Sequence, residues 1–278
     1  MDVYEAVTHY YEHYRGEKQI IGKSHEGRNL YAMLIGDGAH CVGISQYAIH
    51  AREWITALLA IEHIRRGVRC GGVWVLPLMN PDGALLVQKG IGSVSPEWRE
   101  YLIGLNGSED FSLWKANAGG VDLNLNFPAR WGQGRGNRFT PAPHGCVGRK
   151  PLSARESRAL ALFTQAISPQ YTVSWHTKGE EIYWRFHQPL SRAKRDKRIA
   201  KVLSRTTGYP LKNTPFSAGG YKDWCVETLK IPAFTVEVGS DGLCHPLGFE
   251  ALPDILEKNA EALVALNDVM ESVQTGNQ

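Results

Sequence analysis

The residues best able to carry out chemistry are histidines and glutamates that stand at the ends of apolar segments. His50 and Glu53 are three positions apart and directly follow the apolar run that ends at Ile49. An imidazole nitrogen and a carboxylate at this spacing can reach one metal ion from a tight turn. Taken alone, the pair is weak evidence, because a surface glutamate beside a strand-terminal histidine is the more common arrangement, so further residues must support a metal site.

A third candidate ligand is His176, which follows the apolar segment 171–175 and precedes the polar turn 177–180. Two imidazoles and one carboxylate suit zinc, and three protein ligands leave a fourth position for water, as in catalytic sites. We therefore expect His50, Glu53 and His176 to bind one Zn²⁺ per chain.

A fourth residue, Glu237, interrupts the apolar run 233–238. A carboxylate is costly to bury in such a segment without a partner or a function. Zinc-bound water needs a proton acceptor, and a nearby carboxylate usually provides it in hydrolytic sites. Glu237 is therefore our candidate general base, and a glutamate facing solvent from an edge strand is the alternative.

Strands and helices alternate along the chain, which predicts an α/β sandwich. Short apolar, β-branched runs predict strands at 30–35, 41–49, 73–79, 171–175, 181–186 and 233–238. Helical periodicity covers 51–66, 151–167 and 248–273, and the sequence Ser-Ala-Arg-Glu at 153–156 predicts a capping box. In such folds reactive groups gather at the carboxyl ends of the strands, where His50, His176 and Glu237 are expected.

The composition indicates a single globular domain that spans residues 1–278. The chain has 278 residues, of which 43% are hydrophobic, and it contains no repeat or linker of distinct composition. Its 31 basic and 28 acidic residues give a net charge of +3, which argues against nucleic-acid and membrane partners.

The cysteines limit the possible metal ligands, and the N-terminal sequence bears on the cellular location. None of the five cysteines forms a C-x-x-C pair, so a metal site must use histidine and carboxylate ligands. The N-terminal segment is acidic and amphipathic, unlike a secretory signal, and no apolar run reaches the ~20 residues of a membrane span. We therefore expect a cytoplasmic protein, and we make no prediction of its oligomeric state.

Seven separated motifs occur in an order that resembles the zinc carboxypeptidase superfamily. They lie at 21–28, 50–53, 80–83, 120–127, 176, 219–224 and 234–237. The resemblance implies a three-layer α/β/α sandwich with a mixed, mostly parallel central sheet. It also implies that His50, Glu53 and His176 hold Zn²⁺, and that Glu237 takes a proton from the attacking water and passes it to the leaving amine.

Within that superfamily, the segments 111–117, 174–184 and 217–224 are similar to a specialised branch. This branch cleaves the amide between γ-D-glutamate and a diamino acid, such as meso-diaminopimelate, in bacterial cell-wall peptides. The resemblance thus implies a murein stem peptide as substrate. It also aligns Lys115 with the arginine that stabilises the oxyanion in digestive-type carboxypeptidases.

A departure from the digestive pattern occurs at Leu125, where those enzymes carry the arginine that grips the C-terminal carboxylate of the substrate. The segment 130–150 contains several basic residues and no acidic residue, and Arg130 lies six positions after Asn124. Arg130 is our candidate for a replacement contact. The full set of predicted substrate-binding residues is Asn124, Arg130, Lys178, Tyr221 and Lys222.

Two other functions fit these residues less well. A carboxypeptidase acting on ordinary L-peptides would require another group to replace the arginine missing at Leu125. An inactive zinc-containing peptide-binding protein would not need all three ligands together with Glu237. Metal-dependent turnover excludes the second alternative, and a comparison of peptide substrates separates the first.

Overall fold

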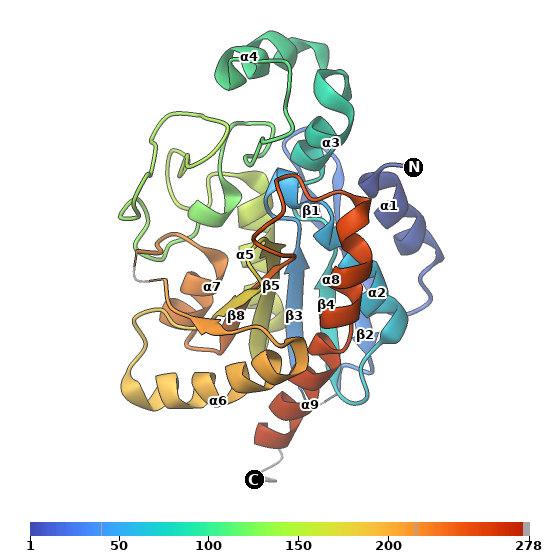
Figure 1. The fold of residues 1–278 in the computed structure, drawn as a ribbon, viewed down its shortest axis with the longest axis vertical. Helices are drawn as coiled ribbons and strands as arrows, with labels where there is room; N and C mark the ends of the chain where they lie inside the picture. Colours follow the sequence, from blue (N-terminus) through green and yellow to red (C-terminus); the bar gives the residue numbers. More distant parts are fainter. Residues whose placement is uncertain (40, 215, 275–278) are drawn as a thin grey trace.

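A single mixed β-sheet forms the centre of the computed structural model, which describes residues 1–39, 41–214 and 216–274 (Figure 1). Its strand order is β1-β2-β4-β3-β5-β8-β6-β7. The strands are β1 (Lys18–Lys23), β2 (Asn29–Gly36), β3 (Val42–Tyr47), β4 (Gly72–Leu76), β5 (Tyr171–Thr177), β6 (Glu181–Tyr183), β7 (Leu211–Lys212) and β8 (Ala233–Val238).

The centre of the sheet is parallel and its flanks contain antiparallel pairs. β4, β3, β5 and β8 run parallel to one another, as do β6 and β7, whereas β2 pairs antiparallel with β1 and β4, and β6 with β8. Strands buried in this way need apolar side chains on both faces, which explains their near-continuous apolar sequences. The predicted mixed, mostly parallel sheet is confirmed.

Helices cover both faces of the sheet and complete the three layers (Figure 1). The helices are α1 (Val3–His13), α2 (Thr56–Arg66), α3 (Pro81–Lys89), α4 (Pro96–Asn106), α5 (Arg155–Ile167), α6 (Leu190–Thr207), α7 (Tyr221–Trp224), α8 (Leu252–Asn259) and α9 (Ala262–Gln274). In the described residues, no helix combines the length and apolar character needed to cross a lipid bilayer.

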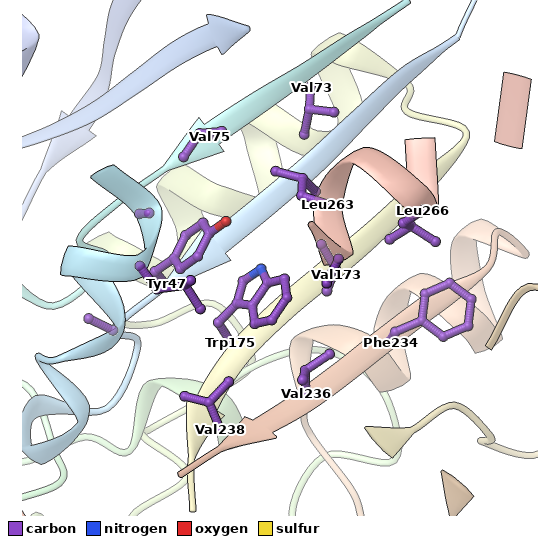
Figure 2. Close-up of a cluster of buried hydrophobic side chains, with 14 of the residues drawn as sticks. Tyr47, Val73, Val75, Val173, Trp175, Phe234, Val236, Val238, Leu263 and Leu266 are labelled. Carbon is purple, nitrogen blue, oxygen red and sulfur yellow. The ribbon is translucent and has the colours of Figure 1, made fainter. Parts of the chain in front are cut away.

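Two buried cores lie on opposite faces of the sheet because successive side chains of a strand point to opposite sides. On one face, Val173 and Trp175 of β5 pack with Leu263 of α9 (Figure 2). On the other face, Ile44 of β3 packs in a core with Leu160 of α5. This two-sided burial holds the carboxyl ends of the central strands in fixed positions.

The same alternation places two predicted site residues together. On β5 and β8, the residues adjacent in register include His176 and Glu237. Their neighbours Trp175 and Val236 face the core of Figure 2. His176 and Glu237 therefore project from the opposite face, side by side on neighbouring strands.

Several helix boundaries differ from the predictions. The segment 51–66 begins with a 3₁₀ turn at Ala51–Glu53 before α2, and the segment 248–273 divides into a 3₁₀ turn, α8 and α9. The periodic patterns also did not predict β1, β7, α1, α3, α4 and α6. Strand β7 has only two residues, whereas α6 has 18 residues but is rich in charged side chains, which leaves few apolar positions to form a pattern.

The predicted capping box at 153–156 is wrong. Helix α5 begins after Ala154, which makes no side-chain cap. The Ser153 hydroxyl instead accepts a hydrogen bond from Asn126, and the Glu156 carboxylate accepts hydrogen bonds from the His25 N–H and the Asn117 amide. Tertiary partners have thus replaced the local capping interactions.

A buried hydrogen-bond network anchors α2 beneath the carboxyl ends of β3 and β5. The Tyr47 hydroxyl lies 2.5 Å from His63 Nδ1, and His63 Nε2 lies 3.0 Å from the backbone oxygen of Asn259. Ser45 links Tyr47 to the indole N–H of Trp175. Burial lowers the pKa of His63 from 6.5 to about 4.

We expect acid to destabilise the folded protein through His63. Below pH ~6.5 the unfolded chain binds a proton on this histidine, whereas the folded chain binds it only near pH ~4. The free energy of unfolding should therefore fall by up to about 3 kcal/mol as the pH is lowered across that interval. His63→Gln retains a polar side chain but does not titrate. Denaturant unfolding at pH 7 and pH 4.5 should therefore show a smaller loss in His63→Gln, and equal losses would contradict the expectation.

Candidate active site

Three side chains from separate elements converge at the carboxyl ends of β3 and β5. His50 follows β3, Glu53 ends the 3₁₀ turn, and His176 lies in β5. His50 Nδ1 is 2.9 Å from Glu53 Oε1, and His176 Nδ1 is 2.9 Å from Glu53 Oε2 and 3.1 Å from His50 Nδ1. All three residues are buried. The predicted ligand set is therefore assembled by the fold.

This donor set fits zinc. One ligand atom from each of the three residues lies within 4.8 Å of the others. Burial disfavours the Glu53 anion, but the two imidazoles outweigh it and hold the pKa of Glu53 well below its usual value. An ionised carboxylate and two imidazoles leave an open fourth position, and bound zinc supplies a Lewis acid that activates water there.

Asp122 contacts the imidazole ring of His50. Its Oδ1 lies 3.3 Å from His50 Nε2, the ring nitrogen directed away from Glu53. A carboxylate in this position fixes the orientation of a metal-binding imidazole and raises its basicity. Burial would raise the pKa of Asp122, but Lys115 and His50 lower it, so the side chain is an anion.

Glu237 is the carboxylate placed to move a proton. It lines the same pocket as His50 and His176. Burial raises its pKa to about 7, with the Glu53 charge adding to the effect and His176 and Lys115 opposing it. A general base is most effective when its pKa lies near the working pH. Glu237 is thus suited to accept a proton from water and to return it to a leaving amine.

Lys115 brings a positive charge to the same space. Its Nζ lies 3.4 Å from Asp122 Oδ2, and Lys115 lines the same pocket as His50. Burial disfavours the ammonium, but the charges of Asp122 and Glu53 prevail and raise the pKa of Lys115. The side chain is therefore cationic, and it can stabilise negative charge on a substrate carbonyl oxygen.

The active-site cleft consists of two adjoining pockets. The first has a volume of about 230 Å³ and contains His50, His176, Glu237, Asn124 and Lys222 in its wall. The second has a volume of about 770 Å³ and is lined by Arg52, Lys115, Asp122, Arg135, Arg138 and His144. Lys115, Leu125, Arg135 and Asn137 line both pockets.

Two of the five predicted substrate-binding residues lie in this cleft. Lys222 is in the wall of the first pocket. Asn124 is in that wall too, and its Oδ1 accepts a hydrogen bond from the backbone N–H of Tyr221, which fixes the amide beside Leu125.

The other three residues lie elsewhere. Arg130 pairs with Glu227 at 3.1 Å and lines neither pocket. The Tyr221 ring is buried, with its hydroxyl 2.8 Å from Thr164 Oγ1. Lys178 Nζ donates hydrogen bonds to Asp241. The polar groups of these three side chains interact with other residues of the protein. Arg135, which lines the cleft, is therefore our expected substrate contact from the basic loop in place of Arg130.

The sequence did not single out Asp122 and Arg52, which line the cleft beside the predicted residues. Asp122 lies in the motif at 120–127, two positions before Asn124, and Arg52 stands between two metal ligands. Their proximity to residues already identified was an available signal. Arg135 belongs to the basic segment 130–150 that the sequence marked as a candidate for substrate contact, but Arg130 was preferred there because it is nearer to Asn124 in the sequence.

The comparison with protein families agrees with this geometry. A family model described as zinc carboxypeptidase matches residues 12–262. The chain belongs to the zinc carboxypeptidase family. It is accordingly a zinc metallopeptidase, and the family resemblance inferred from the ordered motifs is confirmed.

Among curated proteins, this member of the family is similar to gamma-D-glutamyl-L-diamino acid endopeptidase 1 of Lysinibacillus sphaericus. The two are 33% identical over 242 residues, which cover 79% of this chain and 60% of the relative. The chain thus spans about 60% of the length of that relative.

Solved structures show the same fold. The bovine thrombin-activatable fibrinolysis inhibitor superposes with a TM-score of 0.79 at 18% identity, covering 100% of this chain and 98% of that one. The murein-tripeptide amidase MpaA from Escherichia coli superposes with a TM-score of 0.62 at 22% identity, covering 93% of both chains. At these identities the likeness concerns the fold alone.

We expect Lys115→Met to lower kcat while leaving KM and zinc content nearly unchanged. An ammonium that faces the developing oxyanion acts mainly in the transition state, and loss of one such group typically costs about 10²- to 10³-fold in kcat. Steady-state kinetics on zinc-replete protein measure the effect, and Lys115→Arg should recover part of the rate. A rise in KM without a fall in kcat would instead indicate a role in ground-state binding.

Proposed function

We propose that this zinc metallopeptidase hydrolyses the amide between γ-D-glutamate and a diamino acid in murein stem peptides. The observation that carries the proposal is the basic pocket beside the zinc site, which contains Arg52, Arg135 and Arg138 in addition to Lys115. Among the described residues lining this pocket, the carboxylate is that of Asp122, which already interacts with His50 and Lys115. Such a wall favours a substrate with several carboxylates.

The position of Leu125 also supports a changed substrate. It lines both pockets next to Asn124, and an apolar side chain there provides no ion pair for a C-terminal carboxylate. A charge-assisted hydrogen bond is worth about 1.5–3 kcal/mol, so its loss weakens recognition of ordinary peptide C-termini. Arg135 provides a cation in the same space from a different loop.

The two pockets suggest how the substrate is arranged. In this proposal, the wide basic pocket receives the γ-D-glutamyl side, whose free α-carboxylate pairs with its arginines. The smaller pocket, which extends from Glu237 to Lys222, receives the diamino acid that leaves as the amine. The Lysinibacillus sphaericus relative is named for cleavage of the same type of bond, which supports this arrangement.

A defined set of peptides tests the proposal. The zinc-loaded protein is incubated with L-Ala-γ-D-Glu-diaminopimelate, with its α-linked isomer, and with an N-blocked L-dipeptide that has a free C-terminus. Mass spectrometry should show release of diaminopimelate from the γ-linked peptide alone, and a chelator should abolish it. Preferential cleavage of the L-dipeptide would replace the proposal by ordinary carboxypeptidase activity, and no metal-dependent cleavage of any peptide would favour a binding protein.

A further inference from the structure

Helix α6 carries a concentration of positive charge outside the active-site cleft. Seven of its 18 residues are lysine or arginine and one, Asp196, is acidic, which gives the helix a net charge of +6. Because the whole chain has a net charge of +3, the residues outside α6 together carry −3. Asp196 is 1% exposed and pairs with Arg195 at 2.8 Å, so its negative charge does not reach the surface. The net charge of the whole chain thus hides a basic surface.

Four of these cations and one leucine form a stripe along one face of α6. Lys194, Arg198, Lys201 and Arg205 follow one another at intervals of four, three and four residues, which places them on the same side of the helix. All four are exposed, and among the described residues no ion pair joins them to a carboxylate. Leu190, four residues before Lys194 and 75% exposed, continues this basic stripe at its N-terminal end. At 1.5 Å per residue the stripe is about 22 Å long.

A groove beside the basic stripe combines the same cations with an apolar wall. It lies between α6 and α9, which pack together at the lower edge of the molecule in Figure 1, and has a volume of about 420 Å³. Arg198, Lys201 and Arg205 line it together with Val202 and Val269, and none of the described residues that line it is acidic. These residues line neither pocket of the active-site cleft.

The basic stripe costs stability, which a purely structural role does not explain. Like charges three or four residues apart on a helix repel each other. Of the four cations, Arg205 alone lies in the last turn, where the helix dipole favours a positive charge. A solvated helix face usually mixes charges of both signs. An uninterrupted run of exposed cations is therefore best explained by an anionic partner.

The residues around the basic stripe favour a lipid surface over a nucleic acid as that partner. Anionic bilayers attract clusters of lysine and arginine on a helix and accept apolar side chains beside them. Leu190 and the apolar wall of the groove supply such side chains. Single-stranded nucleic acids are instead bound by aromatic side chains that stack on the bases, and α6 contains none.

We propose that the basic stripe of α6 docks the protein on an anionic phospholipid bilayer. The four cations bind lipid phosphates, and Leu190 enters the boundary between headgroups and acyl chains. The groove receives the apolar part of a neighbouring lipid, whose phosphate lies beside Arg198 and Lys201. Because the stripe shares no residue with the active-site cleft, the bilayer and a peptide substrate do not compete for the same side chains.

Co-sedimentation with vesicles tests the proposal. The zinc-loaded protein is mixed at low ionic strength with vesicles of phosphatidylcholine alone, or of equal parts phosphatidylcholine and phosphatidylglycerol. It should bind the anionic vesicles alone, and binding should weaken as salt is added because exposed charges are then screened. Absence of binding to the anionic vesicles at low ionic strength would overturn the proposal.

Removal of cations from the basic stripe should weaken binding. Each cation near an anionic surface contributes about 5-fold in affinity, so Arg198→Gln/Lys201→Gln should bind the anionic vesicles about 25-fold more weakly. Arg149→Gln/Lys150→Gln removes the same charge from two exposed positions of the basic loop and should bind nearly as the wild type does. Zinc content and unfolding temperature show that each variant is folded. Equal losses in the two variants would indicate a response to net charge alone and overturn the role of α6.

Leu190 distinguishes a bilayer from a soluble polyanion. Leu190→Ser should weaken binding to anionic vesicles several-fold and leave any binding to duplex DNA unchanged, because only the bilayer offers an apolar layer. If the wild type binds duplex DNA as tightly as it binds anionic vesicles, and Leu190→Ser changes neither, a nucleic-acid surface replaces the membrane surface. None of these measurements uses peptide cleavage, so their outcome is independent of the proposed function.

Discussion

Glu237→Gln is expected to bind zinc normally and to lose at least about 100-fold in kcat. Glutamine has the shape of glutamate but cannot accept a proton from water at neutral pH. Glu237 lies beside His176 in register and lines the pocket of the zinc ligands, yet it does not belong to the ligand set. Metal analysis of the purified variant and steady-state kinetics on a γ-D-glutamyl peptide measure the two effects separately.

The appropriate control is Glu250→Gln, which makes the same chemical change at an exposed position. It should retain both zinc and wild-type turnover. Near-normal turnover by zinc-replete Glu237→Gln would show that a different group accepts the proton. Loss of zinc from that variant would instead assign Glu237 a part in holding the metal.

The cluster of candidate ligands and the neighbouring Glu237 were predictable because local sequence signals mark them. His50 and His176 stand where an apolar strand pattern ends and a polar turn begins, and Glu237 interrupts the apolar strand pattern 233–238. In parallel strands such residues meet at one edge of the sheet, so the fold class alone predicts that they lie close together. The structure adds the register that makes His176 and Glu237 direct neighbours.

The substrate contacts were much less predictable, because adjacent residues can have opposite surroundings. Tyr221 and Lys222 are neighbours on α7, but the first side chain packs in a core and the second lines the pocket. The basic loop presents the same difficulty. Arg130 has a positive φ of 51° and pairs with Glu227, whereas Arg135 lines the cleft and lies over the Phe216 ring at 3.6 Å.

Long-range polar contacts also escape sequence patterns. The sequence of α5 predicts a local capping box, but Ser153 and Glu156 bond to Asn126, His25 and Asn117 instead. The choice between a local and a distant partner depends on which groups the folded chain brings near. Local propensity is then overridden by the need to satisfy every buried polar group.

His176→Ala is expected to abolish stoichiometric zinc binding and, with it, activity. The variant removes one of the three candidate ligands, the one that lies in β5. Because mutation of an outer partner of a ligand typically weakens metal affinity about 10- to 100-fold, loss of a ligand should have a larger effect. Zinc per chain is measured after dialysis, and affinity is measured by competition with a chelator.

A graded comparison makes the His176 result specific. Asp122→Asn changes only the partner of His50, so its loss of zinc affinity should be intermediate between the wild type and His176→Ala. Zinc that binds the folded state raises the unfolding temperature by mass action, so added zinc should stabilise the wild type but leave His176→Ala unchanged. Retention of one zinc per chain with unchanged affinity in His176→Ala would remove His176 from the ligand set, and an equal zinc-dependent stabilisation of both proteins would place the metal elsewhere.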